Sequence, residues 1–282
     1  MKIISLIENQ VRNEYLEQLH SEHGLSVWIW YQGKNYLLDT GSTNLFAENA
    51  EAMGLNLEDV DTAFLSHAHY DHSGGFAEFF ALNQKAKVYL RKESVEGCYS
   101  QRGEKNRYIG IPEGLLKDYP DRFIFTDSQI EVEKGIWLIP HTTENLEERA
   151  RHNHMIRKKE QGYKTDDFMH EQSLVFEGEK GLVILNSCCH AGVDNVIMEV
   201  QKALPGRNID VMIGGFHLMG ASGAETMGYT REEVEKLGNT LMALPVNRIY
   251  TGHCTGLPAY RILKEMMPEK LDYFSSGTSI EC

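Results

Sequence analysis

Short runs of apolar residues, separated by polar turns, recur along the whole chain. Ile3 to Ile7 and Val211 to Ile213 have the length and the β-branched character of buried strands. Pairs of such runs joined by glycine-containing turns predict hairpins over residues 26–38, 130–139 and 173–185. The sequence therefore predicts sheets rich in hairpins.

Apolar residues at helical spacing alternate with these strands. Helical patterns follow Gly75, Gly192 and Gly256, and Thr230 with Glu233 forms a capping box at the start of another helix. Because strand pairs and helices alternate in two successive halves, we expect two sheets packed face to face with helices outside. No linker divides the chain, so we expect a single domain over residues 1–282, with insertions near residues 93–122 and 141–170.

Charge and composition narrow the class of function. The formal net charge of −13 argues against a nucleic-acid surface, because phosphate neutralisation needs clustered Lys and Arg, and it favours a small-molecule partner. No apolar run approaches the roughly 18 residues of a membrane span, and the N-terminal run is too short for a signal peptide. The five cysteines form no spaced disulfide framework, so we expect a cytoplasmic protein with reduced thiols. The sequence leaves the oligomeric state open.

The candidate chemistry is concentrated in residues 65–75, Leu-Ser-His-Ala-His-Tyr-Asp-His-Ser-Gly-Gly. An apolar run, Thr62 to Leu65, leads into this stretch. We therefore expect His67 and His69 in extended backbone, where residues two apart point the same way, so that both imidazoles face one cation.

Asp71 and His72 do not keep this period, and we expect them to face a second, neighbouring point. Two sets of ligands from one turn predict two metal ions that share a bridging water. A solvated loop is the alternative interpretation. A cluster of ligand types between a buried strand and a glycine-opened helix favours metal, because burying unpaired charge is costly.

The order His67-Ala68-His69-Tyr70-Asp71-His72 resembles the His-x-His-x-Asp-His signature of the metallo-β-lactamase superfamily. Leu37 to Gly41 and Tyr250 to His253 resemble other marks of that superfamily, and the resemblance covers nearly the whole chain. It implies an α/β fold, an αββα sandwich of two mixed sheets with helices on the outer faces and metals at the sheet ends. Segments 187–192, 214–218 and 251–256 resemble a narrower branch that includes archaeal methanopterin-pathway synthases.

The resemblance also implies a set of metal ligands. His253 is expected to join Asp71 and His72 at the second metal. The superfamily usually offers a bridging aspartate after the strand at 182–185, and none stands there. We expect His190 to complete the first set and Cys188 to lie near or between the cations, which leaves the bridging ligand open. Cys189 is expected to pack in the core.

Two further positions have more than one interpretation. Asp39 either caps the turn before the next helix or lies behind the metal histidines and orients them. His141 lies where many superfamily members have a metal-binding histidine. Its context here is Ile139-Pro140-His141 rather than Gly-His-Thr, so we assign His141 no such role.

Asp71 and His217 are the predicted catalytic residues. His217 follows Gly214 and Gly215, which allow close backbone approach to a ligand, and it would act at the rim as an acid/base or an oxyanion contact. The alternative is a core histidine. The basic stretch within 141–170 is either a solvated surface helix or a lid that brings cations to a phosphate or carboxylate of the substrate. The candidate substrate residues are Arg149, Arg151, Arg157 and Lys158.

Three functions are compatible with these features. The first is a hydrolase that uses a metal-bridging hydroxide on a small ester, lactone, thioester or phosphoester. The second, implied by the narrower branch, is a transferase that condenses a dihydropterin methyl diphosphate with a ribofuranosylaminobenzene phosphate-like acceptor. The third is a non-catalytic sensor with a closed metal site. His69 stands where the related di-iron flavoproteins carry a carboxylate, which favours two zinc ions, with manganese or iron as alternatives.

Overall fold

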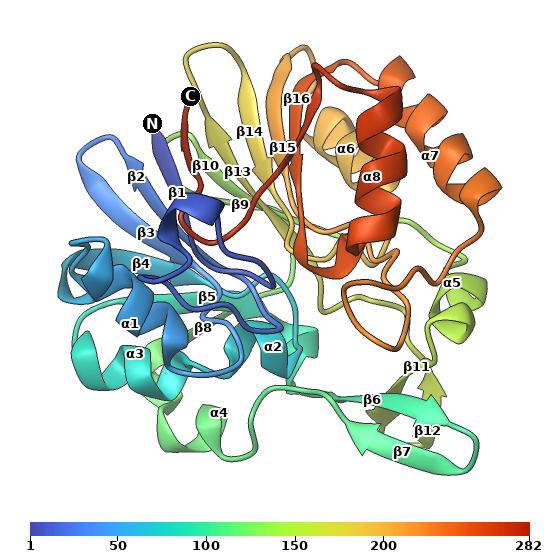
Figure 1. Ribbon diagram of the computed structural model, residues 1–282. Helices are drawn as coiled ribbons and strands as arrows, with labels where there is room; N and C mark the ends of the chain where they lie inside the picture. The colour runs from blue at the N-terminus through green and yellow to red at the C-terminus, as the bar shows by residue number, and fades with distance from the viewer.

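The computed structural model describes residues 1–282, and its apolar runs form two seven-stranded sheets that lie face to face (Figure 1). The first sheet has the order β18-β1-β2-β3-β4-β5-β8, and the second has the order β17-β16-β15-β14-β13-β10-β9. The strands of the first sheet are β1 (Lys2–Ile7), β2 (Ser26–Tyr31), β3 (Lys34–Leu38), β4 (Val60–Phe64), β5 (Lys87–Arg91), β8 (Phe123–Thr126) and β18 (Ser279–Glu281). Those of the second sheet are β9 (Ile130–Glu133), β10 (Ile136–Pro140), β13 (Gln172–Glu177), β14 (Leu182–Leu185), β15 (Ile209–Ile213), β16 (Val246–Thr251) and β17 (Leu271–Tyr273).

Alternation along each strand divides the core into three layers. In β1, Ile3 belongs to the cluster between the sheets, and Ile4 belongs to the cluster under the helices of the first sheet. In β15, Val211 faces the inner cluster and Met212 faces the helices of the second sheet. Successive side chains of a strand point to opposite faces, so strands covered on both sides are apolar throughout.

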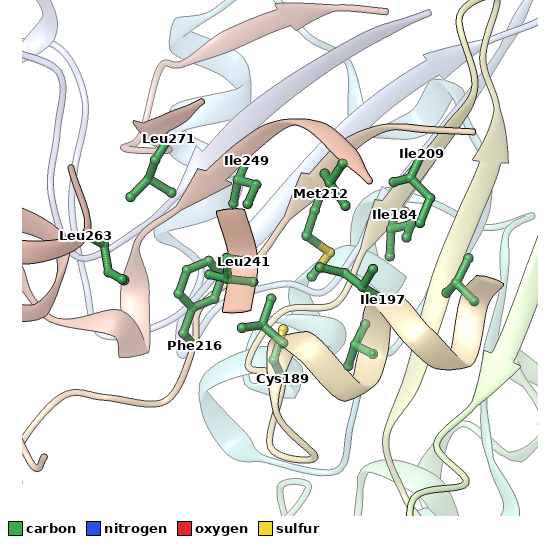
Figure 2. Close-up of a cluster of buried hydrophobic side chains, with 14 of the residues drawn as sticks. Ile184, Cys189, Ile197, Ile209, Met212, Phe216, Leu241, Ile249, Leu263 and Leu271 are labelled. Atoms are coloured by element: carbon green, nitrogen blue, oxygen red, sulfur yellow. The ribbon is translucent and has the colours of Figure 1, made fainter. Parts of the chain in front are cut away.

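Helices cover the two outer faces, as the sequence predicts. On the first sheet lie α1 (Leu45–Ala52), α3 (Phe76–Leu82) and α4 (Leu115–Asp118), and on the second lie α6 (Val193–Ala203), α7 (Arg231–Ala243) and α8 (Leu257–Met266). The capping box of Thr230 and Glu233 is formed at the start of α7. Figure 2 shows the cluster under the second set of helices, where Cys189 packs. None of the helices has the length and apolar character that crossing a bilayer requires.

The remaining helices are short. They are α2 (Tyr70–Ser73), α5 (Glu147–His152) and the 3-10 turns η1 (Asn13–Tyr15), η2 (Leu57–Asp59), η3 (Lys92–Val95), η4 (Pro120–Arg122) and η5 (His253–Thr255).

The two expected insertions join in a third, four-stranded sheet that was not predicted from the sequence. Its order is β12-β11-β6-β7, all antiparallel, with β6 (Gly97–Arg102), β7 (Lys105–Tyr108), β11 (Met155–Lys159) and β12 (Gly162–Thr165). We call these four strands the arm, and Figure 1 shows that it extends away from the two large sheets. The first insertion has the expected short helical turns, but it also forms the charged β6–β7 hairpin. This hairpin is stabilised because β6 pairs with β11, which satisfies the backbone hydrogen bonds of β6.

Candidate metal centre

The candidate site lies where strands of both large sheets end. His67 and His69 follow β4, Cys188 and His190 follow β14, and His253 follows β16. Strands β14, β15 and β16 are parallel, and so are β3 and β4, so their carboxyl ends meet at one edge of each sheet. The chain therefore brings residues more than a hundred positions apart to one place.

Close packing of the connecting turns depends on glycine. A side chain at Gly214 would overlap the carbonyl oxygen of Asn186, and one at Gly74 would overlap that of Ser42. At Gly214 and Gly215 the chain closely approaches the carbonyl of Asn186 and the side chain of Cys254. These glycines fix the turns that carry the site histidines.

The first group of candidate ligands is His67, His69 and His190. Their ligand atoms lie within 4.8 Å of one another, and all three side chains are buried. Nε2 of His67, Nε2 of His69 and both ring nitrogens of His190 have no hydrogen-bond partner. Buried polar atoms are nearly always partnered, so three convergent imidazoles without partners fit a bound cation. Burial lowers the pKa of His69 to about 3 and those of the other two well below the ordinary value, which keeps the imidazoles neutral, as metal ligands must be.

The second group is Asp71, His72 and His253. Oδ2 of Asp71 lies 3.5 Å from Nε2 of His72 and 3.4 Å from Nε2 of His253, and the two imidazole nitrogens are 3.2 Å apart. Ligands about 2.0–2.1 Å from a tetrahedral zinc ion are about 3.4 Å from one another. The separations of this group therefore fit a single divalent ion. The extended geometry expected for residues 67–69 is kept at His69, and Asp71 and His72 lie on the turn of α2.

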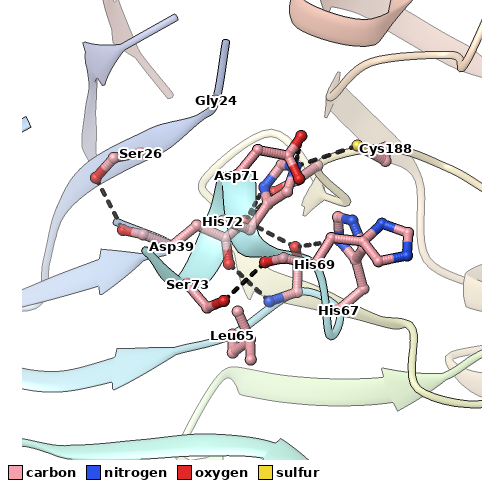
Figure 3. A network of polar contacts seen from close by, with 12 residues as sticks. Gly24, Ser26, Asp39, Leu65, His67, His69, Asp71, His72, Ser73 and Cys188 are labelled. Carbon is pink, nitrogen blue, oxygen red and sulfur yellow. Dashed lines mark hydrogen bonds and ion pairs between the residues drawn. The ribbon is translucent and has the colours of Figure 1, made fainter. Parts of the chain in front are cut away.

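Cys188 lies between the two groups. Its Sγ is 3.3 Å from Nε2 of His72, and it shares a candidate ligand set with His67 and His72, one histidine from each group (Figure 3). Burial raises the pKa of the Cys188 thiol, so a metal that binds the thiolate would have to displace a proton. The structure thus places a sulfur atom where the expected bridging aspartate is missing.

Asp39 lies behind His72. Its Oδ2 accepts hydrogen bonds from Nδ1 of His72 at 2.8 Å, from Ser66 at 2.7 Å and from Ser187 at 2.6 Å. With Nδ1 engaged, Nε2 of His72 faces Asp71 and His253. Burial disfavours the charged imidazolium of His72, but the carboxylates of Asp71 and Asp39 outweigh burial and raise its pKa to about 10. A cation at this point would replace that proton.

Three residues of the site were missed in the sequence, and all come from the segment after β1. Nδ1 of His253 lies 2.9 Å from Oδ1 of Asn9, and the backbone N–H of His253 donates to Glu8. Nε2 of His23 is 3.3 Å from Oδ2 of Asp71, and its ring stacks on His253 with centroids 5.0 Å apart. The available signal was the polar Glu8-Asn9 pair directly after a buried strand.

His217 adjoins the first group. Its ring centroid is 4.4 Å from that of His190, and its Nδ1 is buried without a partner. Burial and the nearby Arg149 lower the pKa of His217 to about 3. Backbone φ is 53° at His217, 48° at His253 and 59° at Asp39, a left-handed conformation that is uncommon outside glycine and concentrated at functional sites.

Comparison with known proteins finds similar sequences and similar folds. Residues 22–150 match the family model of the metallo-beta-lactamase superfamily. The matched segment includes the histidine-rich stretch 67–72. The crystal structure of Tm1679, a metal-dependent hydrolase of the beta-lactamase superfamily, matches 100% of this chain and 99% of its own with a TM-score of 0.82 and 28% identity. The metallo-β-lactamase fold expected from the sequence is confirmed.

Two proteins of Methanocaldococcus jannaschii are also similar. One is a 7,8-dihydropterin-6-methyl-4-(beta-D-ribofuranosyl)-aminobenzene-5'-phosphate synthase, 26% identical over 100% of this chain and 96% of its own. The other is an uncharacterised protein, 26% identical over 93% of this chain and 94% of its own. The similarity to the synthase confirms the resemblance seen in the sequence.

The floor of a cavity of about 610 Å³ is formed by five of the candidate ligands, His69, Asp71, Cys188, His190 and His253. The arm, the turn between α5 and β11 and the loop 219–228 form its walls. Its lining includes Asp71, His190, His217 and His253 from the floor and Arg102 and Arg107 from the arm. It also includes His152 at the end of α5 and His154 in the turn before β11.

The structure does not bring the four candidate substrate residues to this cavity. Arg149 instead supports the floor, because its guanidinium donates to the carbonyls of His190 at 2.6 Å and Phe216 at 3.4 Å. Arg157 is fully buried and ion-paired with Glu96 at 2.7 Å and with Asp167, so its charge is already neutralised. Arg151 and Lys158 are exposed and do not line the cavity.

His141 lies apart from both groups of candidate ligands. Its Nδ1 is 3.1 Å from Oε1 of Glu199, on α6. Burial by itself would lower the pKa of His141, but the hydrogen bond to the Glu199 carboxylate outweighs burial and the pKa is raised. The pair satisfies Nδ1 of His141, whereas its Nε2 is buried without a partner.

Proposed function

We propose that this protein is a metal-dependent hydrolase that acts on a small ester or phosphoester with two divalent cations. The observation that carries the proposal is the pair of adjacent ligand groups, His67-His69-His190 and Asp71-His72-His253. Two members of each group, His69 and His190 and Asp71 and His253, line one cavity. A cavity that opens onto the ligands leaves room for a substrate, which favours an enzyme over a sensor with a closed metal site.

Bound divalent cations would lower the pKa of a coordinated water from about 15.7 toward about 7 and would polarise a substrate oxygen. The chain supplies the other requirements. Asp39 and Asn9 hold the imidazoles of His72 and His253 through Nδ1, which directs Nε2 to the second position. His217 lines the cavity beside the first group with a neutral imidazole, so its free Nδ1 is available for a proton or a hydrogen bond at the substrate.

Zinc suits the donor set best. Imidazole and thiolate ligands favour zinc, whereas manganese prefers carboxylates and carbonyls. Five histidines and Cys188 against a single carboxylate, Asp71, therefore support zinc, with iron or manganese as alternatives.

A transferase reaction is the second candidate, and the similarity to the Methanocaldococcus jannaschii synthase favours it. In that reaction the same residues would hold a diphosphate leaving group while a carbon nucleophile attacks, and water would have to be excluded.

The deciding experiment is a metal analysis together with a substrate screen on one preparation. We expect about two metal ions per chain and turnover of aryl esters or phosphodiesters that a chelator abolishes and added zinc restores. Diphosphate release that requires an aromatic acceptor, without hydrolysis of simple esters, would establish the transferase instead. Absence of both activities from the metal-loaded protein would contradict the proposal.

A further inference from the structure

The wall of the cavity formed by the arm is basic. Ser100 and Arg102 lie two apart on β6, and Arg107 on β7 pairs directly with Ser100. Residues two apart on a strand, and residues directly opposite each other on neighbouring strands, share a face of the sheet. All three line the cavity, so this face of the hairpin is turned to the metal centre.

Neither guanidinium has a counter-charge. Arg102 and Arg107 are exposed and make no ion pair, whereas Arg157 of the same sheet is held by two carboxylates. Asp71 is the only acidic residue that lines the cavity, and it lies within 3.5 Å of His23, His72 and His253. In a chain with a net charge of −13, an unneutralised pair of arginines facing the cavity is a local reversal of charge.

Arg107 lies close to the metal centre. Its guanidinium is 5.8 Å from the ring centroid of Tyr70, the residue that precedes Asp71. A small molecule held at the floor therefore has the arginines within reach. Two guanidinium forks and the Ser100 hydroxyl match the several oxygens of a phosphoryl group or a carboxylate.

We propose that Arg102 and Arg107 form an anion subsite, so that the substrate carries a phosphoryl or carboxylate group separate from the group held at the histidines. This inference rests on the proposed function of the same cavity, and it assigns substrate selection to the β6–β7 hairpin rather than to the basic stretch 149–158.

The arm offers a matched control. Lys158 on β11 pairs with Gly97 and Tyr163, next to the buried Arg157, and therefore points to the opposite face of the arm. It is exposed and makes no ion pair. Lys158→Gln removes the same unit of charge from the same sheet without changing the face turned to the cavity.

The test compares binding of alkanediphosphonates of increasing chain length with that of alkylphosphonates of the same length, by calorimetry on zinc-loaded protein. One phosphonate would occupy the floor, and the second would reach the arginines only in the diphosphonates. We expect the diphosphonate of the best length to bind about tenfold more tightly than its monophosphonate. Arg102→Gln with Arg107→Gln should reduce this preference to about twofold or less, and Lys158→Gln should retain it.

The outcomes separate the two proposals. Equal binding of diphosphonates and monophosphonates at every length would overturn the anion subsite even if the protein hydrolyses esters. So would a loss of the diphosphonate preference in Lys158→Gln as large as that in the double arginine variant. A preference that depends on the two arginines would support the subsite even if no ester is turned over, because phosphonates report binding alone. Unchanged thermal unfolding of all variants would show that the exposed substitutions leave the fold intact.

Discussion

The sulfur of Cys188 lies 3.3 Å from Nε2 of His72, whose other ring nitrogen donates to Asp39. The thiol is therefore in contact with a candidate metal ligand, His72, and the hydrogen bond to Asp39 fixes the orientation of that imidazole ring. A thiolate there would be shared with, or adjacent to, both ligand groups, because Cys188 also lies within reach of His67.

Replacing Cys188 should therefore change the metal site and not only the packing. We expect Cys188→Ser to weaken binding of at least one metal ion about tenfold or more, because a soft thiolate ligand is lost. In cobalt-substituted protein, the sulfur-to-metal charge-transfer absorption should disappear. Cys282→Ser, at the far end of the chain, serves as the control, and an identical cobalt spectrum in Cys188→Ser would remove the thiol from the ligand set.

The two ligand groups should lose metal separately. His190→Ala removes a ligand of the first group, and His253→Ala removes one of the second, so each variant should retain about one metal ion where the wild type binds about two. Elemental analysis after gel filtration measures this directly. His20→Ala, an exposed histidine paired with Glu48, should not change the content. Loss of both ions from each variant would indicate one cooperative site.

His217 should matter for turnover and not for metal content. It belongs to none of the groups whose ligand atoms converge, yet it lines the cavity beside His190. We expect His217→Ala to bind metal normally and to lower kcat by about 10²–10⁴ as an acid/base group would. His20→Ala, an exposed histidine that does not line the cavity, is the control. A fully active His217→Ala enzyme would exclude the catalytic role.

Glu8 should make the stability of the metal-free protein depend on pH. Burial raises its pKa from 4.5 to about 7, although hydrogen bonds from His253, Gln10 and Tyr273 oppose the shift. Between these two values the native state holds a proton that the unfolded state has lost. The contribution of protonated Glu8 to the free energy of unfolding is therefore fully present below about pH 4.5 and is lost as pH rises through about 7.

Glu8→Gln should flatten this dependence. In urea unfolding of chelator-treated protein, the free energy of unfolding of the wild type should fall by a few kcal/mol more than that of Glu8→Gln between pH 4.5 and 7. Parallel stability curves for the two proteins over that range would contradict the assignment. Tyr273→Phe, which removes one hydrogen bond to Glu8, should leave the direction of the slope unchanged.

Several features were predictable because their causes are local. The apolar runs, the glycine turns and the Thr230 capping box act over a few residues, so β1, β15 and the start of α7 were correctly anticipated. The spacing of His67, His69, Asp71 and His72 is likewise local, and by itself it indicates two ligand groups.

Only the tertiary structure decided which distant residues meet. The arm forms because two separate insertions pair with each other through backbone hydrogen bonds between β6 and β11. Neither insertion has an apolar pattern from which this pairing could be predicted. Arg157 is basic in sequence like Arg102, but it is neutralised by Glu96 and Asp167, and only Arg102 faces the cavity without a counter-charge. The sequence gives the charge of each residue, but whether that charge can bind a ligand depends on which distant residues the fold places next to it.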